Sequence, residues 1–210
     1  MKFIKLSVLL FLLLFLTGCK NSNNISLNSE NTNTPSPVKT STNTTSPAQN
    51  TEMAIPQNTE ELIKEFTTTI HTKTQSRQHN LELTSSKING HIVKSGETFS
   101  FCTLVGRSTP EAGYLKAEIF DSKGNKKQGY GGGNCQVSST LFNAVDGATG
   151  LEVLERHNHS NKVPYIETGK DAAIYYGSYD FKFRNNNDFD IKIISEPTKD
   201  NLAIKIMKIL

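Results

Sequence analysis

A cysteine placed directly after a run of glycines is the residue most able to do chemistry in this sequence. Gly131, Gly132 and Gly133 come before Cys135 and Gln136, where a helix is predicted to begin. A thiol that opens a helix meets unpaired N–H groups and the positive end of the helix dipole, and both favour a thiolate. The same N–H groups could stabilise an oxyanion. The pattern therefore predicts that Cys135 attacks a carbonyl group.

Two histidines and two aspartates follow this cysteine and could complete a nucleophilic site. His157 and His159 are two residues apart, so in an extended segment they face the same way and either is a candidate base. Asp171, or as a weaker choice Asp180, is the candidate acid that orients the imidazole. The chain order of nucleophile, base and acid is that of a cysteine acyl-transfer site, which needs neither a cofactor nor a metal.

Three other interpretations of the same residues stay open. Cys135 could be a small apolar residue that packs the start of a helix. His157 and His159, with Cys135 and an aspartate, could instead hold zinc with one open position. A phosphate-binding loop is the weakest alternative, because no Lys-Ser or Lys-Thr pair follows the glycines.

One central helix and several strands must position these side chains. Apolar residues recur at helical spacing over 136–148, and a second helix is expected over 80–88 with Asn80 as its cap. The segment 60–70 is ambiguous between helix and strand. Strands are predicted over 91–93, 98–101, 114–121, 151–156, 174–176, 181–183, 191–194 and 202–209. These elements predict an α+β fold in which one helix packs on a mostly antiparallel sheet.

The N-terminal quarter of the chain is expected to lie outside this fold. Residues 1–18 resemble a lipoprotein signal peptide, because two lysines precede a short apolar run that ends at Leu16-Thr17-Gly18-Cys19. The resemblance implies lipid on Cys19 and attachment to the outer face of a bacterial cell membrane. Residues 19–55 are rich in Asn, Ser, Thr and Pro and are predicted to form a disordered tether. The folded domain is expected over 56–210.

The overall charge argues against one class of partner. The chain has 23 Lys and Arg against 20 Asp and Glu, a net charge of +3, so nothing predicts a nucleic-acid surface. Its 3 cysteines are too few for a disulfide framework. The sequence gives no indication of an oligomer.

Between Arg77 and Asn187 the sequence resembles the VanW family, which is named after a protein encoded with vancomycin-resistance genes. The motifs that carry the resemblance, in chain order, are Ile88-Asn89-Gly90, Ser95-Gly96-Glu97-Thr98-Phe99-Ser100-Phe101, Val105-Gly106, Gly113-Tyr114-Leu115-Lys116-Ala117, Gly131 to Leu141, Glu155-Arg156-His157-Asn158-His159-Ser160, Gly169-Lys170-Asp171-Ala172 and Asp180 to Asn185. Two positions depart from the family pattern, namely Cys102 and Asn134. Outside the cytoplasm, Cys102 could pair with Cys135 and block its chemistry.

The resemblance implies a role in the cell envelope and leaves two classes of function open. One is an acyl-transfer enzyme, similar in layout to papain or transglutaminase, that acts on peptidoglycan peptides or surface proteins. The other is a module without catalysis that binds a cell-wall fragment or a partner in the glycine-rich cleft. In both cases the residues expected to contact the bound molecule are Gly131, Gly132, Gly133, Gln136, Ser138 and Arg156.

Overall fold

The computed structural model describes residues 59–121 and 125–210, so the predicted signal peptide, Cys19 and the predicted tether lie outside the described residues. The described part is α+β, as the sequence predicts, and every strand pairing in it is antiparallel. No helix among the described residues is long and apolar enough to cross a membrane.

The largest sheet has four strands in the order β1-β9-β8-β2. Its strands are β1 (Glu60–Thr69), β9 (Asn201–Ile209), β8 (Ile191–Pro197) and β2 (Ile92–Val93). Alternate residues of β8 and β9 are buried, which is the period of two expected when one face of a sheet is covered. The segment 60–70, which the sequence left ambiguous between helix and strand, forms the edge strand β1. It pairs with β9 along almost its whole length, and this pairing favours the strand.

A second sheet of three strands has the order β3-β7-β6. It contains β3 (Thr98–Ser100), β7 (Lys182–Asn185) and β6 (Leu151–Glu155). A separate hairpin pairs β4 (Lys116–Phe120) with β5 (Lys126–Tyr130), which the sequence did not mark as a strand. The short helix α2 (Phe101–Val105) follows β3 directly and was also not predicted.

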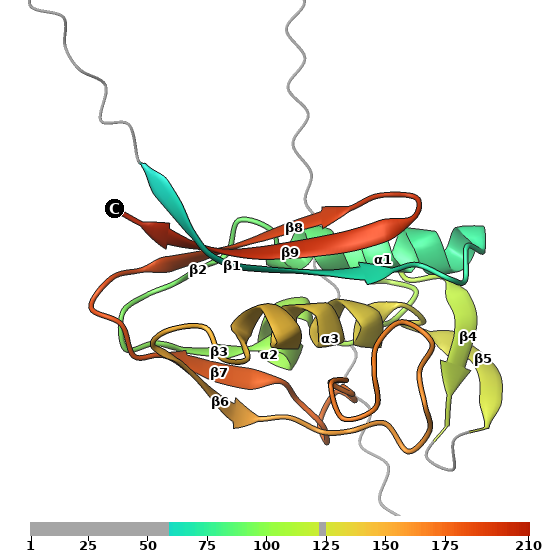
Figure 1. The fold of residues 1–210 in the computed structure, drawn as a ribbon. Helices are drawn as coiled ribbons and strands as arrows, with labels where there is room; N and C mark the ends of the chain where they lie inside the picture. Colours follow the sequence, from blue (N-terminus) through green and yellow to red (C-terminus); the bar gives the residue numbers. More distant parts are fainter. Residues whose placement is uncertain (1–58, 122–124) are drawn as a thin grey trace, which may run out of the picture. The chain divides into compact units, whose positions relative to one another are not determined.

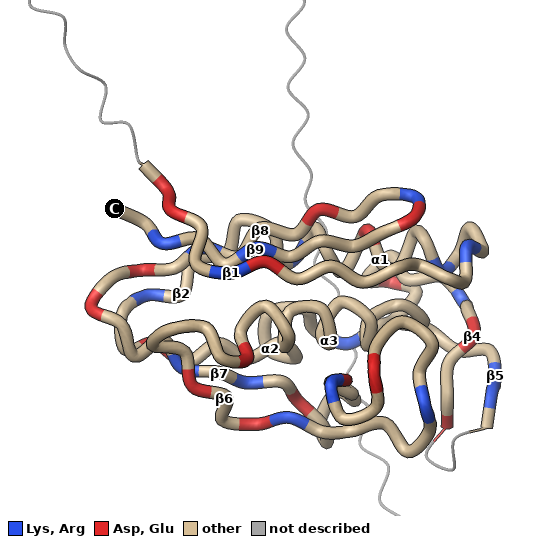
Figure 2. The backbone as a smooth tube through the Cα atoms, in the orientation of Figure 1, with Lys and Arg blue, Asp and Glu red and all other residues tan. Residues whose placement is uncertain are grey.

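The helix α3 (Asn134–Val145) lies between the two larger sheets (Figure 1) and contacts β1, β9 and β6. Eleven of its 12 residues are buried, and the exception is Cys135, which is partly exposed. The helix carries no charged residue (Figure 2). A helix buried on all sides is the centre of a core, and here only the cysteine at its first turn reaches solvent.

The start and cap predicted for one helix are wrong, and so is one predicted strand. The helix α1 (Gln75–Ile88) begins five residues before Asn80, which lies inside the helix and uses its buried side-chain amide to bond Leu115 and Gly132. The segment 174–176 is not a strand. It enters a tight turn in which Tyr175 pairs only with Tyr179, and Gly177 supplies the positive φ of 88° that this turn requires.

Candidate functional site

Cys135 occupies the first turn of α3, where the sequence places it. Gly133 precedes the helix with a φ of 118°, a conformation that side chains disfavour. The N–H groups of Asn134, Gln136 and Val137 donate to carbonyl oxygens of the glycine turn. Within the described residues, the N–H of Cys135 itself has no such acceptor. The Cys135 N–H is thus the free backbone donor beside the thiol, because the Gln136 N–H already bonds the Gly133 carbonyl at 3.0 Å.

His159 and Asp171 meet in the long loop between β6 and β7. The Nδ1 atom of His159 lies 2.6 Å from Oδ2 of Asp171, and the His159 backbone N–H donates to the same oxygen at 2.6 Å. Because an ionised carboxylate only accepts hydrogen bonds, Nδ1 carries a proton and Nε2 is left to face another group. The imidazole interacts with the Cys135 thiol, whose Sγ also lies 3.8 Å from the Ile174 carbonyl oxygen.

These three side chains shift each other's ionisation towards a charged pair. Burial opposes the charged form of each, yet hydrogen bonding and charge from His159 lower the pKa of Cys135. Burial is likewise outweighed at the imidazole, where the thiol and Asp171 raise the pKa of His159. At Asp171 burial is outweighed by the backbone N–H and imidazole of His159, which lower its pKa. The arrangement favours a thiolate beside an imidazolium.

Polar side chains of α3 fasten this loop to the helix. Ser138 Oγ donates to the Ala172 carbonyl at 2.6 Å, and the Ala172 N–H donates to Ser139 Oγ at 2.9 Å. Asn143 bonds the Lys170 carbonyl at 2.6 Å in the same way. These contacts flank Asp171 on both sides, so a fully buried helix fixes the acid that orients His159.

Arg156 completes this fastening from the end of β6. Its Nη1 donates to the carbonyl oxygens of Gly169 at 3.1 Å and Asp171 at 2.5 Å, and its guanidinium lies over the Phe142 ring. Ser138 and Arg156 were predicted to contact a bound molecule. In the structure both side chains donate to carbonyl oxygens of the loop that carries Asp171.

The glycines before the helix are packed against the protein itself. A Cβ added at Gly132 would lie 2.6 Å from the Glu118 carbonyl oxygen, and one at Gly133 would lie 3.2 Å from that of Arg77. Both glycines are buried, so the space that they leave is filled by β4 and α1 and is not open to a ligand. Gly131 is partly exposed but faces Ser108 closely. The glycines therefore permit close packing at this end of α3.

Gln136, another predicted contact residue, is also used inside the domain. Its side-chain amide donates to Thr68 Oγ1 and to the Thr69 carbonyl, both at 3.1 Å. Its Oε1 accepts from Nη2 of Arg77 at 2.9 Å. Gln136 therefore links α3 to β1 and α1 beside Cys135, at the first turn of α3.

His157 and Asp180 belong to a different cluster, which forms around Cys102. His157 stacks on Tyr179 and lies 2.9 Å from Glu155, so it does not share a face with His159. Asp180 accepts from the Cys102 N–H at 2.8 Å. The segment after β6 is not a strand, and the two histidines bond different carboxylates. Neither His157 nor Asp180 is joined to Cys135 by a contact in the structure.

Both Cys102 and Cys135 are free thiols in the structure, so the pairing considered from the sequence is not formed. Burial and the neighbouring Asp180 carboxylate raise the pKa of Cys102 to about 12. No group of three or more His, Cys, Asp or Glu side chains within residues 59–121 and 125–210 is arranged to hold a metal ion. The zinc alternative therefore has no support from the described residues.

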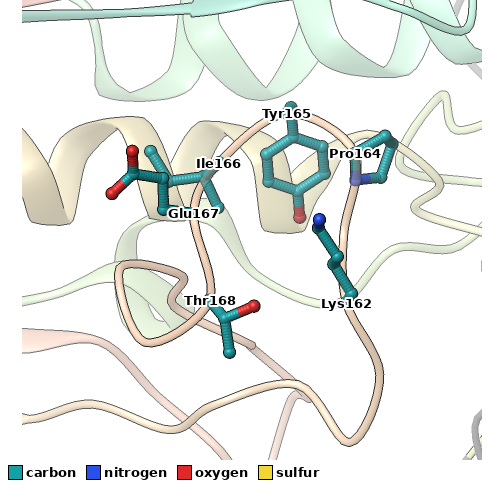
Figure 3. A pocket seen from close by; sticks show the side chains of 6 residues that line it. All are labelled: Lys162, Pro164, Tyr165, Ile166, Glu167 and Thr168. Carbon is teal, nitrogen blue, oxygen red and sulfur yellow. The ribbon is translucent and has the colours of Figure 1, made fainter.

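Two pockets border the loop that carries the histidine and the acid. One, of about 230 Å³, is lined by residues on both arms of the loop, including His159 and Asp171. The other, of about 430 Å³, is open and lined by Lys162, Pro164, Tyr165, Ile166, Glu167 and Thr168. Figure 3 shows the Tyr165 ring and the Lys162 side chain between the two arms of this loop. Burial raises the pKa of Tyr165, and the Cys135 charge adds to this effect.

Three residues at the site were not singled out by sequence reasoning. They are Arg77 on α1, Ser139 on α3 and Tyr165 in the loop. Ser139 lies in the motif from Gly131 to Leu141, but no role was assigned to it from the sequence. Arg77 and Tyr165 lie 58 and 30 residues from Cys135 in the sequence. Only the packing of α1 and the loop on α3 brings them to the thiol.

The chain is similar to one protein family and to two known proteins. The family model described as "VanW like protein" matches residues 76–207. The chain is 40% identical over 159 residues to the "Uncharacterized protein YoaR" of Bacillus subtilis (strain 168), covering 76% of this chain and 52% of that protein. It is 35% identical over 124 residues to the "Vancomycin B-type resistance protein VanW" of Enterococcus faecalis (strain ATCC 700802 / V583), covering 57% of this chain and 44% of that protein.

The chain thus spans about half the length of these two curated relatives. No solved structure matches it significantly. The family model covers more than half of the chain and contains every residue of the site around Cys135. The chain belongs to the VanW-like protein family.

Proposed function

We propose that this protein is a cysteine acyl-transfer enzyme in which Cys135 is the nucleophile, His159 the base and Asp171 the residue that orients the imidazole. The observation that carries the proposal is the 2.6 Å contact between His159 Nδ1 and Asp171 Oδ2, with the same imidazole set against the thiol that opens α3. A thiolate, a base and an acid in this order form the arrangement that activates cysteine nucleophiles.

The residues supply each proton and bond of a two-step transfer. The Cys135 thiolate attacks the amide carbonyl carbon, and a C–S bond forms while the oxygen becomes negatively charged. The free N–H of Cys135 faces that charge at the helix terminus. The His159 imidazolium then gives its proton to the amide nitrogen, the C–N bond breaks and an amine leaves. Water or a second amine attacks the thioester, His159 takes its proton, and the thiolate is released.

We propose peptidoglycan peptides or surface proteins as the substrate class, because the predicted lipid on Cys19 would confine the domain to the outer face of the membrane. The name of the relative in Enterococcus faecalis, a vancomycin resistance protein, is in keeping with such a place of action. Labelling cells with a fatty-acid probe tests the anchor. The probe is expected on the wild-type chain and absent from Cys19→Ala, whereas equal labelling of both would contradict it.

Trapping the acyl intermediate tests the enzyme. Purified protein is mixed with peptidoglycan stem peptides and quenched in acid, and intact mass spectrometry measures adducts on Cys135. We expect a thioester adduct in the wild type and in Cys102→Ala, and none in Cys135→Ala. Accumulation in His159→Ala should be slower. Binding of the peptides without an adduct or product, unchanged by Cys135→Ser, would instead establish the module without catalysis.

A further inference from the structure

Arg77 on α1 lies beside the thiol without being part of the proposed triad. Its Nη2 donates to Oε1 of Gln136 at 2.9 Å, and Gln136 is the residue after Cys135. Its backbone carbonyl oxygen would lie 3.2 Å from a Cβ at Gly133, so α1 packs tightly on the turn that opens α3. The guanidinium is therefore held at the same helix end as the cysteine.

The positive charge of Arg77 is not paired with a carboxylate of the described residues. No carboxylate lies within ion-pair distance, and its Nε is buried without a hydrogen-bond partner in that part of the chain. Its Nη1 likewise bonds none of the described residues. The groups whose charges act on it are Tyr165, Cys135 and Glu118, and Glu118 is already paired with Lys126 at 2.9 Å. Burial lowers the pKa of Arg77, so the structure holds a charge there at a cost.

We propose that Arg77 forms a carboxylate-binding subsite beside Cys135. A guanidinium carries several N–H donors and matches a carboxylate in shape and charge better than an ammonium does, and here Gln136 accepts from only one of these donors. The subsite deepens the proposed function and rests on it. It restricts the substrate to acyl donors that carry a carboxylate next to the carbonyl that Cys135 attacks. Arg156, the cation expected from the sequence to hold such a group, uses its Nη1 on two loop carbonyls instead.

Two alkylating probes of the same size test this subsite. Iodoacetate carries a carboxylate next to its reactive carbon, and iodoacetamide carries a neutral amide there. The rates of both at Cys135 are measured in the full-length chain by mass spectrometry of the peptide that contains it. The pH is set above the ionisation of the thiol, so that the ratio of rates reports recognition of the carboxylate. The variants are Arg77→Gln, Arg77→Lys and, as a matched cation near the pocket, Lys162→Gln.

We expect the ratio of iodoacetate to iodoacetamide rates to fall about tenfold in Arg77→Gln, as for loss of a hydrogen bond to a charged group. Arg77→Lys should keep part of the preference, and Lys162→Gln should keep all of it. A ratio unchanged in Arg77→Gln, or lowered equally in Lys162→Gln, would overturn the subsite. Thermal unfolding shows whether each variant is folded. If Arg77→Gln does not fold, the ratio of the two rates in Arg77→Lys tests the subsite instead. Slow reaction of Cys135 with iodoacetamide in the wild type contradicts the proposed function separately.

Discussion

Two clusters of the same residue types lie on this domain, one around Cys135 and one around Cys102. Each cysteine lies in the first turn of a helix, and a histidine from the segment after β6 belongs to each cluster. The outcomes are opposite. The pKa of Cys135 is lowered by His159 against the effect of burial, whereas burial and Asp180 raise the pKa of Cys102 to about 12.

The pKa values of the two thiols shift in opposite directions because different groups lie next to each sulfur. His159 faces the Cys135 thiol, and Asp171 holds the other side of its ring. Beside Cys102 the neighbour is a carboxylate, and the Cys102 thiol donates to the Tyr179 carbonyl at 3.4 Å. The presence of a cysteine, a histidine and an acid is thus not enough for a nucleophile. We therefore expect matched substitutions in the two clusters to have unequal effects.

The largest difference is expected for the cysteines themselves. Cys135→Ala should reduce acyl transfer by at least about 10³-fold, because the covalent step is lost. Cys102→Ala should leave the rate within about threefold, because its sulfur contacts the Tyr179 carbonyl and the Asp180 carboxylate and has no base beside it. Turnover of a stem peptide by both variants measures the difference. Equal losses would show that the two clusters act together.

The histidines provide the next comparison. His159→Ala should slow alkylation of Cys135 about 10²-fold near neutral pH, since the pKa of the thiol rises when the imidazolium is removed. His157→Ala should change it less than about threefold, because its ring bonds Glu155 and stacks on Tyr179. A larger effect of His157→Ala than of His159→Ala would reverse the assignment of the base.

Asp171 raises the pKa of His159, whereas Asp180 raises the pKa of Cys102. Asp171→Asn removes a negative partner that raises the pKa of His159, so the imidazolium should lose its proton at lower pH. The alkaline limb of the activity profile should then move to lower pH and the rate should fall about tenfold. Asp180→Asn should leave that profile in place and lower the pKa of Cys102. Titration of the two thiols in each variant checks both directions.

The smallest effect concerns the fastening of the loop. Arg156→Met keeps the apolar stem and loses the bonds to the Gly169 and Asp171 carbonyls, which should cost about 1–2 kcal/mol of unfolding free energy. Arg184→Met, on an exposed arginine of β7, is the matched control and should cost less than about 0.5 kcal/mol. Urea unfolding measures both, and equal values would mean that Arg156 does not hold the loop.

Sequence reasoning reached further for the fold than for the site. Helical periodicity located α3, and alternation located β8 and β9, because buried faces leave their period in the chain. The hairpin strand β5 was missed, since its residues are mostly polar and glycine. The turn after Ile174 was mistaken for a strand because three apolar residues start it.

At the site, the motif placed Cys135 correctly but left two histidines and two acids as candidates. The choice between His157 and His159 depends on a loop held by side chains, and such a path leaves no periodic signal. The sequence also predicted ligand contacts for Gln136, Ser138 and Arg156, because polar residues near a cysteine suggest a binding site. In the structure their side chains form hydrogen bonds within the domain.

Alkylation of both thiols in one molecule across a range of pH tests the central claim most directly. Iodoacetamide is added to the full-length chain, and mass spectrometry measures the rate at the Cys135 and Cys102 peptides separately. We predict a midpoint for Cys135 below the ordinary thiol value of about 8.5, with Cys102 unreactive over the same range. A Cys135 midpoint at or above that value, or equal profiles for the two thiols, would contradict it.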